Sequence, residues 1–409
     1  ELSKHRITKI ARPHTSTLAA LVTNRRCDRC THRLALPCAK SRYRCFPATC
    51  SKRSPSTAKM QRLILALALQ ACAAYVAPQS RAPRGTILRD SPFDGIGDLL
   101  EQVAAPPEDS SLPSGSFGAV VTGGAAGVGY AYADEFLRRG HKVVICDIRD
   151  PADAVRALKD KYGADAPIFG EVCDVSDTAS VRKLAASSKE KLGTVHYWIN
   201  NAALNGGRKP FLEVSDEAIE AVVKVNMFGV LICTKVAMEL MLDQSGVTGH
   251  VFNTVGSGVR GGGTPGYVTY GAAKRGLPQM TDSLVAELEG KTQGYNWPPS
   301  SPGQVKVHTL SPGMVFTDLL LKDSTPELRK FPFGVLAATP EEVAQDLVPK
   351  MLATTEAGTF VEYLTKPRTL LKFFNRFVRQ QKSDIIDDDG NVIQKSGEKY
   401  NEDGVRALY

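Results

Sequence analysis

Short apolar runs alternate with longer amphipathic stretches between about residue 116 and residue 365. The runs Ala119–Val121, His141–Asp147 and Tyr197–Ala203 are short and apolar, which is typical of buried strands. A stretch such as Tyr130–Gly140 has a helical pattern and ends at a glycine, a common helix stop. Strands alternating with helices predict βαβ units and a parallel sheet. The expected fold is therefore α/β, with a Rossmann-like, doubly wound parallel sheet.

Composition divides the chain into five expected segments. Residues 1–59 form a basic upstream extension, either untranslated or disordered, and residues 60–90 have the pattern of a leader. Residues 91–115 are rich in Pro, Ser and acids and read as a linker. Residues 116–355 are expected to be one domain, and residues 356–409 an amphipathic helix with a polar tail.

The leader begins at Met60 and has the parts of a signal peptide. Arg62 provides a positive charge, Leu63–Leu69 is apolar, and Ala71-Cys72-Ala73 resembles a cleavage site. This apolar run is far shorter than the ~20 residues that a membrane span needs. The basic, Ser-containing sequence that follows resembles the second part of the plastid leader in algae with complex plastids. We expect plastid localisation, with the secretory pathway as the alternative.

Charge and cysteine content exclude several classes of protein. Residues 1–59 hold 14 of the 51 Lys and Arg but only 2 of the 43 Asp and Glu, so the rest of the chain is mildly acidic. No nucleic-acid partner is expected. Cys27-x-x-Cys30 lacks a second pair at zinc-site spacing, so no metal is predicted. Three cysteines in apolar runs are expected to be buried free thiols: Cys146, Cys173 and Cys233.

A glycine-rich turn joins the first predicted strand to a helix. Glycines let the backbone approach a pyrophosphate, and the free N–H groups of a helix N-terminus attract it. A second strand follows and ends at Asp147, where a carboxylate can bind ribose hydroxyls and favour NADH. Arg149 could instead attract a 2′-phosphate. The residues expected to hold the cofactor at this turn are Thr122, Gly123, Gly127, Val128 and Gly129.

Two further strand ends are expected to contact the cofactor. The third strand ends in Val172-Cys173-Asp174-Val175, where Asp174 and Val175 would lie at the adenine. Asp174 has the alternative role of a helix N-cap, for which Ser176 competes. Asn201 and Ala202 follow the fourth strand, where small residues would allow approach to the nicotinamide ribose.

A third group of residues suits carbonyl reduction. Tyr270 and Lys274 are four residues apart, on one face of a predicted helix, and Ser257 precedes Tyr270 by thirteen residues. Because an unperturbed phenol has a pKa of ~10, we expect Lys274 to lower the pKa of Tyr270, against the effect of desolvation. Tyr270 would donate the proton, Ser257 would orient the carbonyl, and Asn226 would hold a water beside Lys274. Lys274 would also hold the ribose of the cofactor, so Tyr270 and Lys274 are expected to contact the cofactor as well. Thr254 is the alternative hydroxyl, although it lies far upstream of the helix.

These motifs, in this order, resemble the short-chain dehydrogenase/reductase family over residues 116–355. The resemblance implies an NAD(P)-dependent oxidoreductase with a seven-stranded parallel sheet and a single domain. It also implies that the segment after the sixth strand contacts the nicotinamide, through Pro312, Gly313, Val315 and Thr317. Ala203 stands where the family usually has glycine.

Within that family, several stretches resemble the plastid chlorophyll b reductases, among them GHVFNTVGSGVRGGGTP. The implied reaction is NAD(P)H-dependent reduction of the ring B formyl group of chlorophyll(ide) b to hydroxymethyl, in chlorophyll breakdown. Asp147-Ile148 replaces the Ser-Arg pair that suits NADPH in those enzymes, which leaves the cofactor preference open. The alternatives are another apolar carbonyl or alcohol substrate, and a non-catalytic dinucleotide-binding scaffold that holds pigment–protein complexes.

Two segments near the C-terminus have expected surface roles. Leu319–Ala338 is rich in Leu, Phe and Pro, and would either cover the nicotinamide beside a flat apolar substrate or pack on the domain. Lys366–Arg379 has one apolar and one basic helical face. Such a helix could lie on an anionic membrane or dock on its own domain or a partner subunit. A homo-oligomer is a further expectation.

Overall fold

A computed structural model describes residues 94–256, 259–260, 262–292 and 303–393. The predicted upstream extension, the leader and Cys27-x-x-Cys30 all lie outside these residues, as does Ser257.

The centre of the fold is the predicted seven-stranded sheet, in which every neighbouring pair is parallel. The strand order is β3-β2-β1-β4-β5-β6-β7. From β1, the chain adds strands first on one side (β2, β3) and then on the other (β4 to β7). This change of side between β1 and β4 opens a crevice at the carboxyl ends of these strands. The strands are β1 (Gly118–Thr122), β2 (Lys142–Asp147), β3 (Ile168–Val172), β4 (Tyr197–Asn200), β5 (Gly249–Thr254), β6 (Val305–Ser311) and β7 (Phe360–Glu362).

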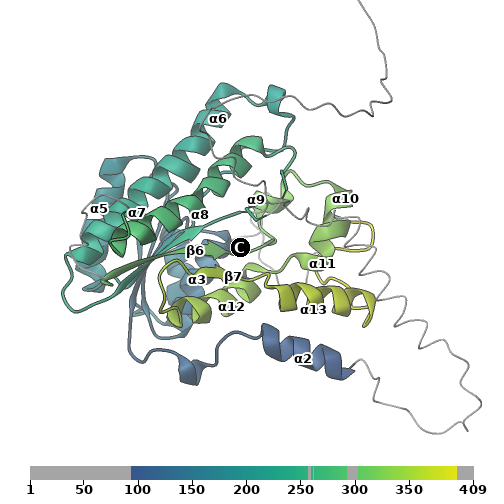
Figure 1. The fold of residues 1–409 in the computed structure, drawn as a ribbon, viewed down its shortest axis with the longest axis horizontal. Coiled ribbons are helices and arrows are strands. Elements are labelled where there is room, and N and C mark those ends of the chain that lie inside the picture. The colour runs from purple at the N-terminus through teal and green to yellow at the C-terminus, as the bar shows by residue number, and fades with distance from the viewer. Residues whose placement is uncertain (1–93, 257–258, 261, 293–302, 394–409) are drawn as a thin grey trace, which may run out of the picture. The chain divides into compact units, whose positions relative to one another are not determined.

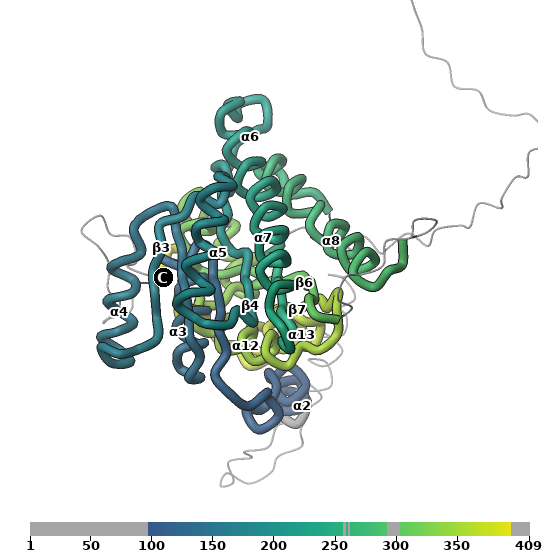
Figure 2. The backbone as a smooth tube through the Cα atoms, turned by 90° about the vertical axis from the view of Figure 1, so that its left-hand side faces the viewer, coloured from purple at the N-terminus to yellow at the C-terminus, as the bar shows by residue number. Residues whose placement is uncertain are grey.

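Helices cover both faces of the sheet (Figures 1 and 2). Alternate residues of β1 enter opposite cores, Val121 on one side and Val120 on the other, which explains why the strand is apolar throughout. One face carries α3 (Gly127–Arg138), α4 (Ala152–Tyr162) and α12 (Pro340–Leu352). The other carries α5 (Thr178–Leu192), α7 (Val230–Leu242) and α8 (Val268–Leu288). The predicted doubly wound fold is confirmed.

Judged only by its length and composition, one helical segment of the described residues, Asp216–Leu242, could cross a membrane. It consists of α6 (Asp216–Val223), the π-helical turn η3 (Lys224–Gly229) and α7. Its α7 portion packs in the core through Cys233, Val236 and Met241, and such core helices have the same composition as membrane spans.

The predicted linker at 91–115 contains two helical elements, α2 (Asp94–Ala104) and the 3₁₀ turn η1 (Asp109–Ser111). α2 packs beside α13 (Lys366–Phe377), as both views show (Figures 1 and 2). Arg379, just after α13, donates to Glu101 at 2.7 Å, and Arg368 donates to the carbonyl of Ala104 at 2.5 Å. This segment is therefore held to the domain by contacts with residues far along the chain.

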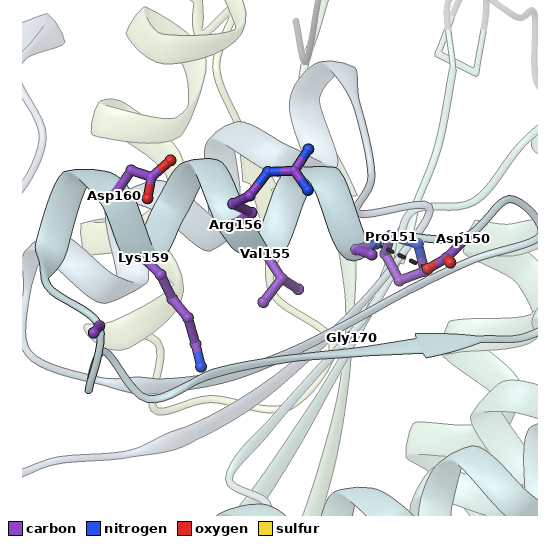
Figure 3. A pocket seen from close by; sticks show the side chains of 9 residues that line it. Asp150, Pro151, Val155, Arg156, Lys159, Asp160 and Gly170 are labelled. Atoms are coloured by element: carbon purple, nitrogen blue, oxygen red, sulfur yellow. Dashed lines mark hydrogen bonds between the residues drawn. The ribbon is translucent and has the colours of Figure 1, made fainter.

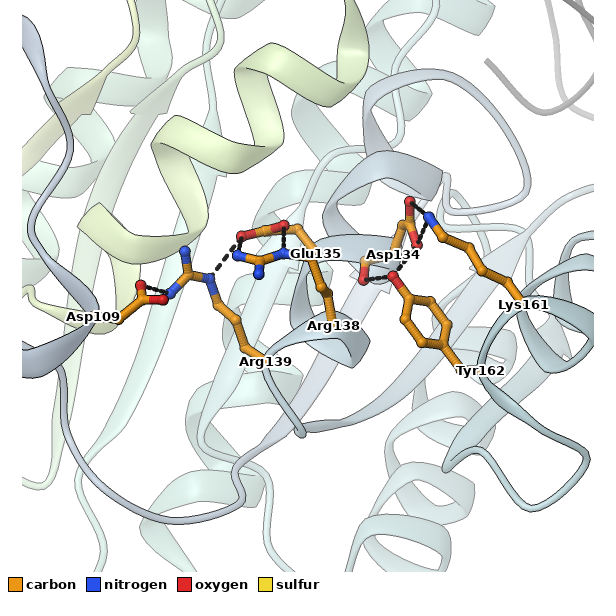
Figure 4. A network of polar contacts seen from close by, with 7 residues as sticks. All are labelled: Asp109, Asp134, Glu135, Arg138, Arg139, Lys161 and Tyr162. Atoms are coloured by element: carbon orange, nitrogen blue, oxygen red, sulfur yellow. Dashed lines mark hydrogen bonds and ion pairs between the residues drawn. The ribbon is translucent and has the colours of Figure 1, made fainter. Parts of the chain in front are cut away.

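A polar network attaches η1 and α4 to α3 (Figure 4). Arg139 lies 2.5 Å from Asp109 and 2.7 Å from the buried carboxylate of Glu135. Arg138 contacts the same carboxylate at 2.7 Å. On the other side of α3, Asp134 accepts hydrogen bonds from Lys161 and Tyr162 of α4.

The C-terminal region packs on the domain through its basic residues. Arg368 forms an ion pair of 2.6 Å with the buried Asp346 of α12, and Lys372 donates to the carbonyl of Ala337 at 3.2 Å. Ile385 and Ile386 pack against Phe316 and neighbouring side chains. The basic face of α13 is thus engaged within the molecule, so a membrane contact would depend on exposed apolar side chains and stays a prediction. The sheet also extends past residue 355, because β7 pairs with β6.

Four histidines lie at one end of the sheet, where they predict acid-sensitive stability: His141, His250 and His308 are buried and His196 is half-buried. His250 Nδ1 lies 3.0 Å from His308 Nε2. Burial lowers the pKa of His141 and of His250 to about 4 and that of His308 to about 3, and it also lowers the pKa of His196. Between these values and the ordinary pKa of ~6.5, the unfolded chain binds more protons than the folded chain.

We therefore expect the free energy of unfolding to fall as the pH drops below about 6.5, by up to ~1.4 kcal/mol per pH unit for each histidine. Urea unfolding at pH 7.5, 6.5 and 5.5 measures this slope. The His308→Gln variant has one titrating group fewer and should show a shallower slope. Equal slopes in the two proteins would show that other groups carry the acid sensitivity.

Candidate active site

The glycine turn after β1 forms a cradle of main-chain atoms. Gly123 and Gly127 have φ values of 64° and 58°, which side chains other than glycine rarely adopt. A Cβ on Gly129 would collide with the carbonyl of Gly123 and lie 2.6 Å from Nδ2 of Asn201. α3 begins at Gly127, and its N-cap residue, Ala126, offers no side-chain cap. The N-terminal N–H groups of α3 therefore suit an anion such as a pyrophosphate.

Asn201 and Thr122 attach this turn to the end of β4. The Oγ1 of Thr122 accepts hydrogen bonds from the backbone of Asn201 and Ala202, at 3.0 and 3.1 Å. The side chain of Asn201 donates to the carbonyls of Thr122 and Gly123. Asn201 and Thr122 thus hold the carboxyl ends of β1 and β4 together.

The two acids predicted to contact the cofactor lie at the ends of β2 and β3. Asp147 accepts from the backbone N–H of Ala125 at 3.4 Å, and Arg149 Nε lies 3.6 Å from its carboxylate. Asp174 accepts from the backbone and the hydroxyl of Ser176. Asp177 caps α5, so Asp174 does not have the alternative N-cap role.

One cleft of about 880 Å³ lies at the carboxyl ends of the strands, and Thr122 and Gly129 are not among the residues that line it. Of the predicted cofactor residues, the cleft is lined by Gly123, Gly127, Val128, Asp147, Asp174, Val175, Asn201, Ala202 and Thr317. Its composition fits a dinucleotide: a main-chain cradle at one end, an acid near the ribose position, and small residues after β4. When bound, NAD(P)H supplies the hydride for carbonyl reduction.

Tyr270 lies in the first turn of α8 and its hydroxyl lies against Gly256. A Cβ on Gly256 would collide with Oη of Tyr270 and lie 2.7 Å from Cε1. Gly256 directly precedes Ser257, so the backbone that leads to this serine passes the phenol. The ring of Tyr267 packs edge-on to that of Tyr270, with the centroids 6.5 Å apart.

Lys274 lies one turn further along α8 and is almost fully buried. Its Nζ donates to the carbonyl of Thr254 at 2.8 Å. Burial raises the pKa of Tyr270 to about 12 and lowers the pKa of Lys274 to about 8. In this structure desolvation thus outweighs the expected effect of Lys274 on the phenol. Tyr270 is protonated at neutral pH, which suits a proton donor.

Asn226 lies in η3 and is fully buried. Its Oδ1 accepts from the backbone N–H of Leu204 at 2.9 Å, and its Nδ2 donates to the carbonyl of Leu204 at 2.6 Å. The side-chain amide thus binds the loop after β4, and the expected role of Asn226 in holding a water beside Lys274 stays a prediction.

The segment after β6 brings Thr317 to the cleft. A Cβ on Gly127 would lie 3.4 Å from the Cγ2 of Thr317. Gly313, with a φ of 76°, packs on Leu364, and Val315 is buried. Pro312, Gly313 and Val315 support the segment and do not line the cleft. The predicted covering loop contains the short elements α9 (Asp318–Leu321), α10 (Pro326–Leu328), η4 (Arg329–Phe333) and α11 (Gly334–Leu336).

A second hollow of about 610 Å³ lies between α4 and the edge strand β3 (Figure 3). Val155 and Lys159 point towards the strand at Gly170. This hollow shares Asp150, Arg156 and Asp160 with the larger cleft, and neither Tyr270 nor Lys274 is among the residues that line either one. Within the described ranges, no three or more His, Cys, Asp or Glu side chains are grouped to hold a metal ion.

The structure adds contacts that motif reasoning missed. Thr254 contributes the carbonyl that binds Lys274, although its hydroxyl has no partner within the described residues. Asn205 donates to the carbonyl of Leu319 at 2.6 Å and so links the loop after β4 to α9. Leu204 lines the cleft mouth beside Leu319. Each of these residues lies at or after the end of β4 or β5. Because the carboxyl ends of parallel strands meet at one edge of the sheet, this position in the sequence could have identified them as candidate site residues.

Comparison with known proteins agrees with this geometry. The family model described as short chain dehydrogenase matches residues 118–327. The chain is 40% identical over 264 residues to chlorophyll(ide) b reductase NOL, chloroplastic, of Arabidopsis thaliana, covering 63% of this chain and 72% of that protein. It is 35% identical over 301 residues to the protein of the same name in Oryza sativa subsp. japonica, covering 72% and 82%.

Among solved structures, the 3-ketoacyl-(acyl-carrier-protein) reductase from Brucella melitensis, complexed with NADH, has a TM-score of 0.52. It is 24% identical, covers 62% of this chain and 98% of its own, and so supports the fold alone. The family match, the sequence relatives and the cleft agree with one another. The chain therefore belongs to the short-chain dehydrogenase family and is an NAD(P)-dependent oxidoreductase.

Proposed function

We propose that this oxidoreductase reduces the ring B formyl group of chlorophyll b or chlorophyllide b to hydroxymethyl. The proposal is supported by the 40% identity to a chlorophyll(ide) b reductase across the domain that holds the cleft. The observation that carries it is the placement of Tyr270 and Lys274 on one helix beside the backbone that leads to Ser257. A dinucleotide-binding scaffold would have no use for this proton-donating pair.

In the proposed reaction, hydride adds to the formyl carbon and a proton must reach the oxygen. Tyr270 is protonated at neutral pH and donates that proton from Oη. Lys274 is mostly charged at neutral pH and stabilises the phenolate that remains. Ser257 would orient the formyl oxygen by a hydrogen bond. The product is the alcohol, and solvent restores the proton on Tyr270.

The mouth of the cleft suits a flat apolar substrate. Leu204 and Leu319 line it, and each side chain is 42% exposed. Asn205 holds these two segments together. Incubation of the purified chain with chlorophyll b, chlorophyllide b and each reduced cofactor tests the proposal, with loss of the formyl chromophore followed by absorbance. An unchanged spectrum with every combination would reject it.

The second part of the proposal concerns the cofactor. We expect NADH to be used at least as well as NADPH, because the carboxylate of Asp147 would repel a 2′-phosphate. Arg149 lies near the same carboxylate and would attract that phosphate. The Asp147→Ser variant should shift the ratio of kcat/KM values towards NADPH by about tenfold.

Asp153→Ser is the control for this variant, because Asp153 lines the cleft from α4 and should leave the ratio unchanged. A strong NADPH preference in the wild type that Asp147→Ser barely alters would show that Arg149 determines the choice.

We also propose that the protein acts in the plastid, since the relatives are named as chloroplastic. The leader pattern at residues 60–90 supports this location. Import of the full chain into isolated plastids, compared with a chain that lacks residues 1–90, tests it.

A further inference from the structure

Two cysteines from neighbouring strands lie together beneath one end of the cofactor cleft. In the parallel pair of β2 and β3, Cys146 stands opposite Glu171. Cys173 comes two residues after Glu171, so both cysteines point to the same face of the sheet. The backbone N–H of Cys173 donates to the carbonyl of Asp147 at 2.8 Å, which continues the pairing of the two strands. Both thiols therefore belong to the core that α5 and α7 cover.

The two thiols differ in their access to the cleft. Cys146 is fully buried and is not among the residues that line the cleft. Cys173 is only 2% exposed, but it lines the cleft directly before Asp174 and Val175, which we expect to contact the adenine. A small molecule in the cleft can thus reach the sulfur of Cys173, and Cys146 lies behind it.

The surroundings of Cys173 favour its thiolate. The thiol of Cys146 donates a hydrogen bond to the sulfur of Cys173, which lowers the pKa of Cys173 and raises that of Cys146. The hydroxyl of Ser180 donates to the same sulfur and lowers its pKa further. Burial and two nearby carboxylates, those of Asp174 and Asp177, oppose this effect without outweighing it. Because the thiolate is the form that reacts with oxidants, Cys173 has the properties of a reactive cysteine with a second thiol in contact.

We propose that Cys173 and Cys146 form a site of reversible oxidation by peroxides that controls cofactor binding. The thiolate of Cys173 attacks one oxygen of hydrogen peroxide, the O–O bond breaks, and hydroxide leaves. The sulfur of Cys146 then attacks the resulting sulfenic acid, the S–O bond breaks, and water leaves as the disulfide forms. In total, the two thiols lose two electrons and two protons, and the peroxide is reduced to water.

The disulfide would displace the adenine end of the cleft. Two bonded sulfur atoms are about 2.05 Å apart, which is much closer than two hydrogen-bonded thiols. The end of β3 must therefore move towards β2, and Asp174 and Val175 move with it. Conversely, a bound dinucleotide covers Cys173 and excludes the peroxide. Oxidation of the pair and binding of the cofactor thus oppose each other.

Treatment of the full chain with hydrogen peroxide tests this inference. Tryptic mass spectrometry should find a disulfide that joins the peptides at residues 143–149 and 162–182. After the peroxide has been removed, the Kd for NADH from fluorescence titration should be about tenfold higher, which is the effect of losing roughly one hydrogen bond. Dithiothreitol should restore the original Kd. Saturating NAD⁺ during the treatment should prevent both changes.

Three variants separate this pair from the other cysteines of the chain. Cys173→Ser should have the same Kd for NADH before and after peroxide. In Cys146→Ser, oxidation of Cys173 should stop at the sulfenic acid, which dimedone traps. The matched control is Cys233→Ser, because Cys233 is a free thiol buried in the same core, and this variant should keep the wild-type response.

A wild type that forms no such cross-link would overturn the inference, as would a cross-link that leaves the Kd for NADH unchanged. Oxidation of Cys173 at the same rate with NAD⁺ bound would show that its sulfur lies outside the cofactor site, and would also overturn it. An equal rise in Kd in Cys173→Ser would assign the effect to other cysteines. These measurements follow the disulfide and the cofactor, so they do not depend on which carbonyl the enzyme reduces.

Discussion

The Tyr270→Phe variant should lose about 10³-fold in kcat for carbonyl reduction while it retains cofactor binding. The substitution removes only the hydroxyl, so the ring continues to pack on Tyr267. The raised pKa of Tyr270, about 12, means that the wild-type phenol carries its proton at neutral pH. Without that proton the oxyanion lacks the donor that we propose for it. Steady-state rates and NAD(P)H fluorescence titration measure the two effects.

Tyr267→Phe is the matched control for this experiment. It removes a hydroxyl from the neighbouring ring, but the residue four positions later is Gly271, so no amine lies one turn along the helix. We expect this variant to retain most of the activity. Near-normal rates in Tyr270→Phe would show that another group or a water donates the proton.

The Gly256→Ala variant should lose at least about 100-fold in kcat, because small displacements of a reacting group have effects of this size. The added methyl group would occupy the position of the Tyr270 hydroxyl. The phenol or the strand end must move, and either change displaces the hydroxyl that we propose as the proton donor. Neither Gly256 nor Tyr270 lines the cofactor cleft, so the affinity for NAD(P)H should not change.

Gly262→Ala provides the comparison for this variant. Gly262 lies on the same connection between β5 and α8, and a Cβ there would have no atom within 4 Å. It should leave the rate unchanged, and circular dichroism should show that both variants fold. Full activity in Gly256→Ala, or equal losses in both variants, would contradict the close packing of glycine and phenol.

Much of the site was predictable because its chemistry is encoded over short distances. The turn at Gly123–Gly129 and the Tyr270–Lys274 pair each depend on the geometry of one strand–turn–helix unit or one helix. The role of Lys274 was harder to predict. Its effect on the phenol depends on burial, and burial depends on every element packed around α8.

Segments outside the central domain were less predictable. The predicted linker has a Pro-, Ser- and acid-rich composition, but α2 forms within it and packs on α13. The contacts of Arg379 with Asp98 and Glu101 join residues about 280 positions apart. The C-terminal helix could equally have been read as a membrane-surface helix. Its amphipathic pattern is the same whether a lipid or another helix covers the apolar face.

The order of strands and helices and the doubly wound class could be read from the amino-acid sequence, as could the residues that we propose for the cofactor and proton-donor sites. These follow from periodicity, turn chemistry and helical spacing, which act over one or two elements. The contacts between Asn226 and Leu204 and between Thr254 and Lys274 became visible only in the folded structure. Such contacts result from the packing of many elements at once, and no local pattern along the chain encodes them.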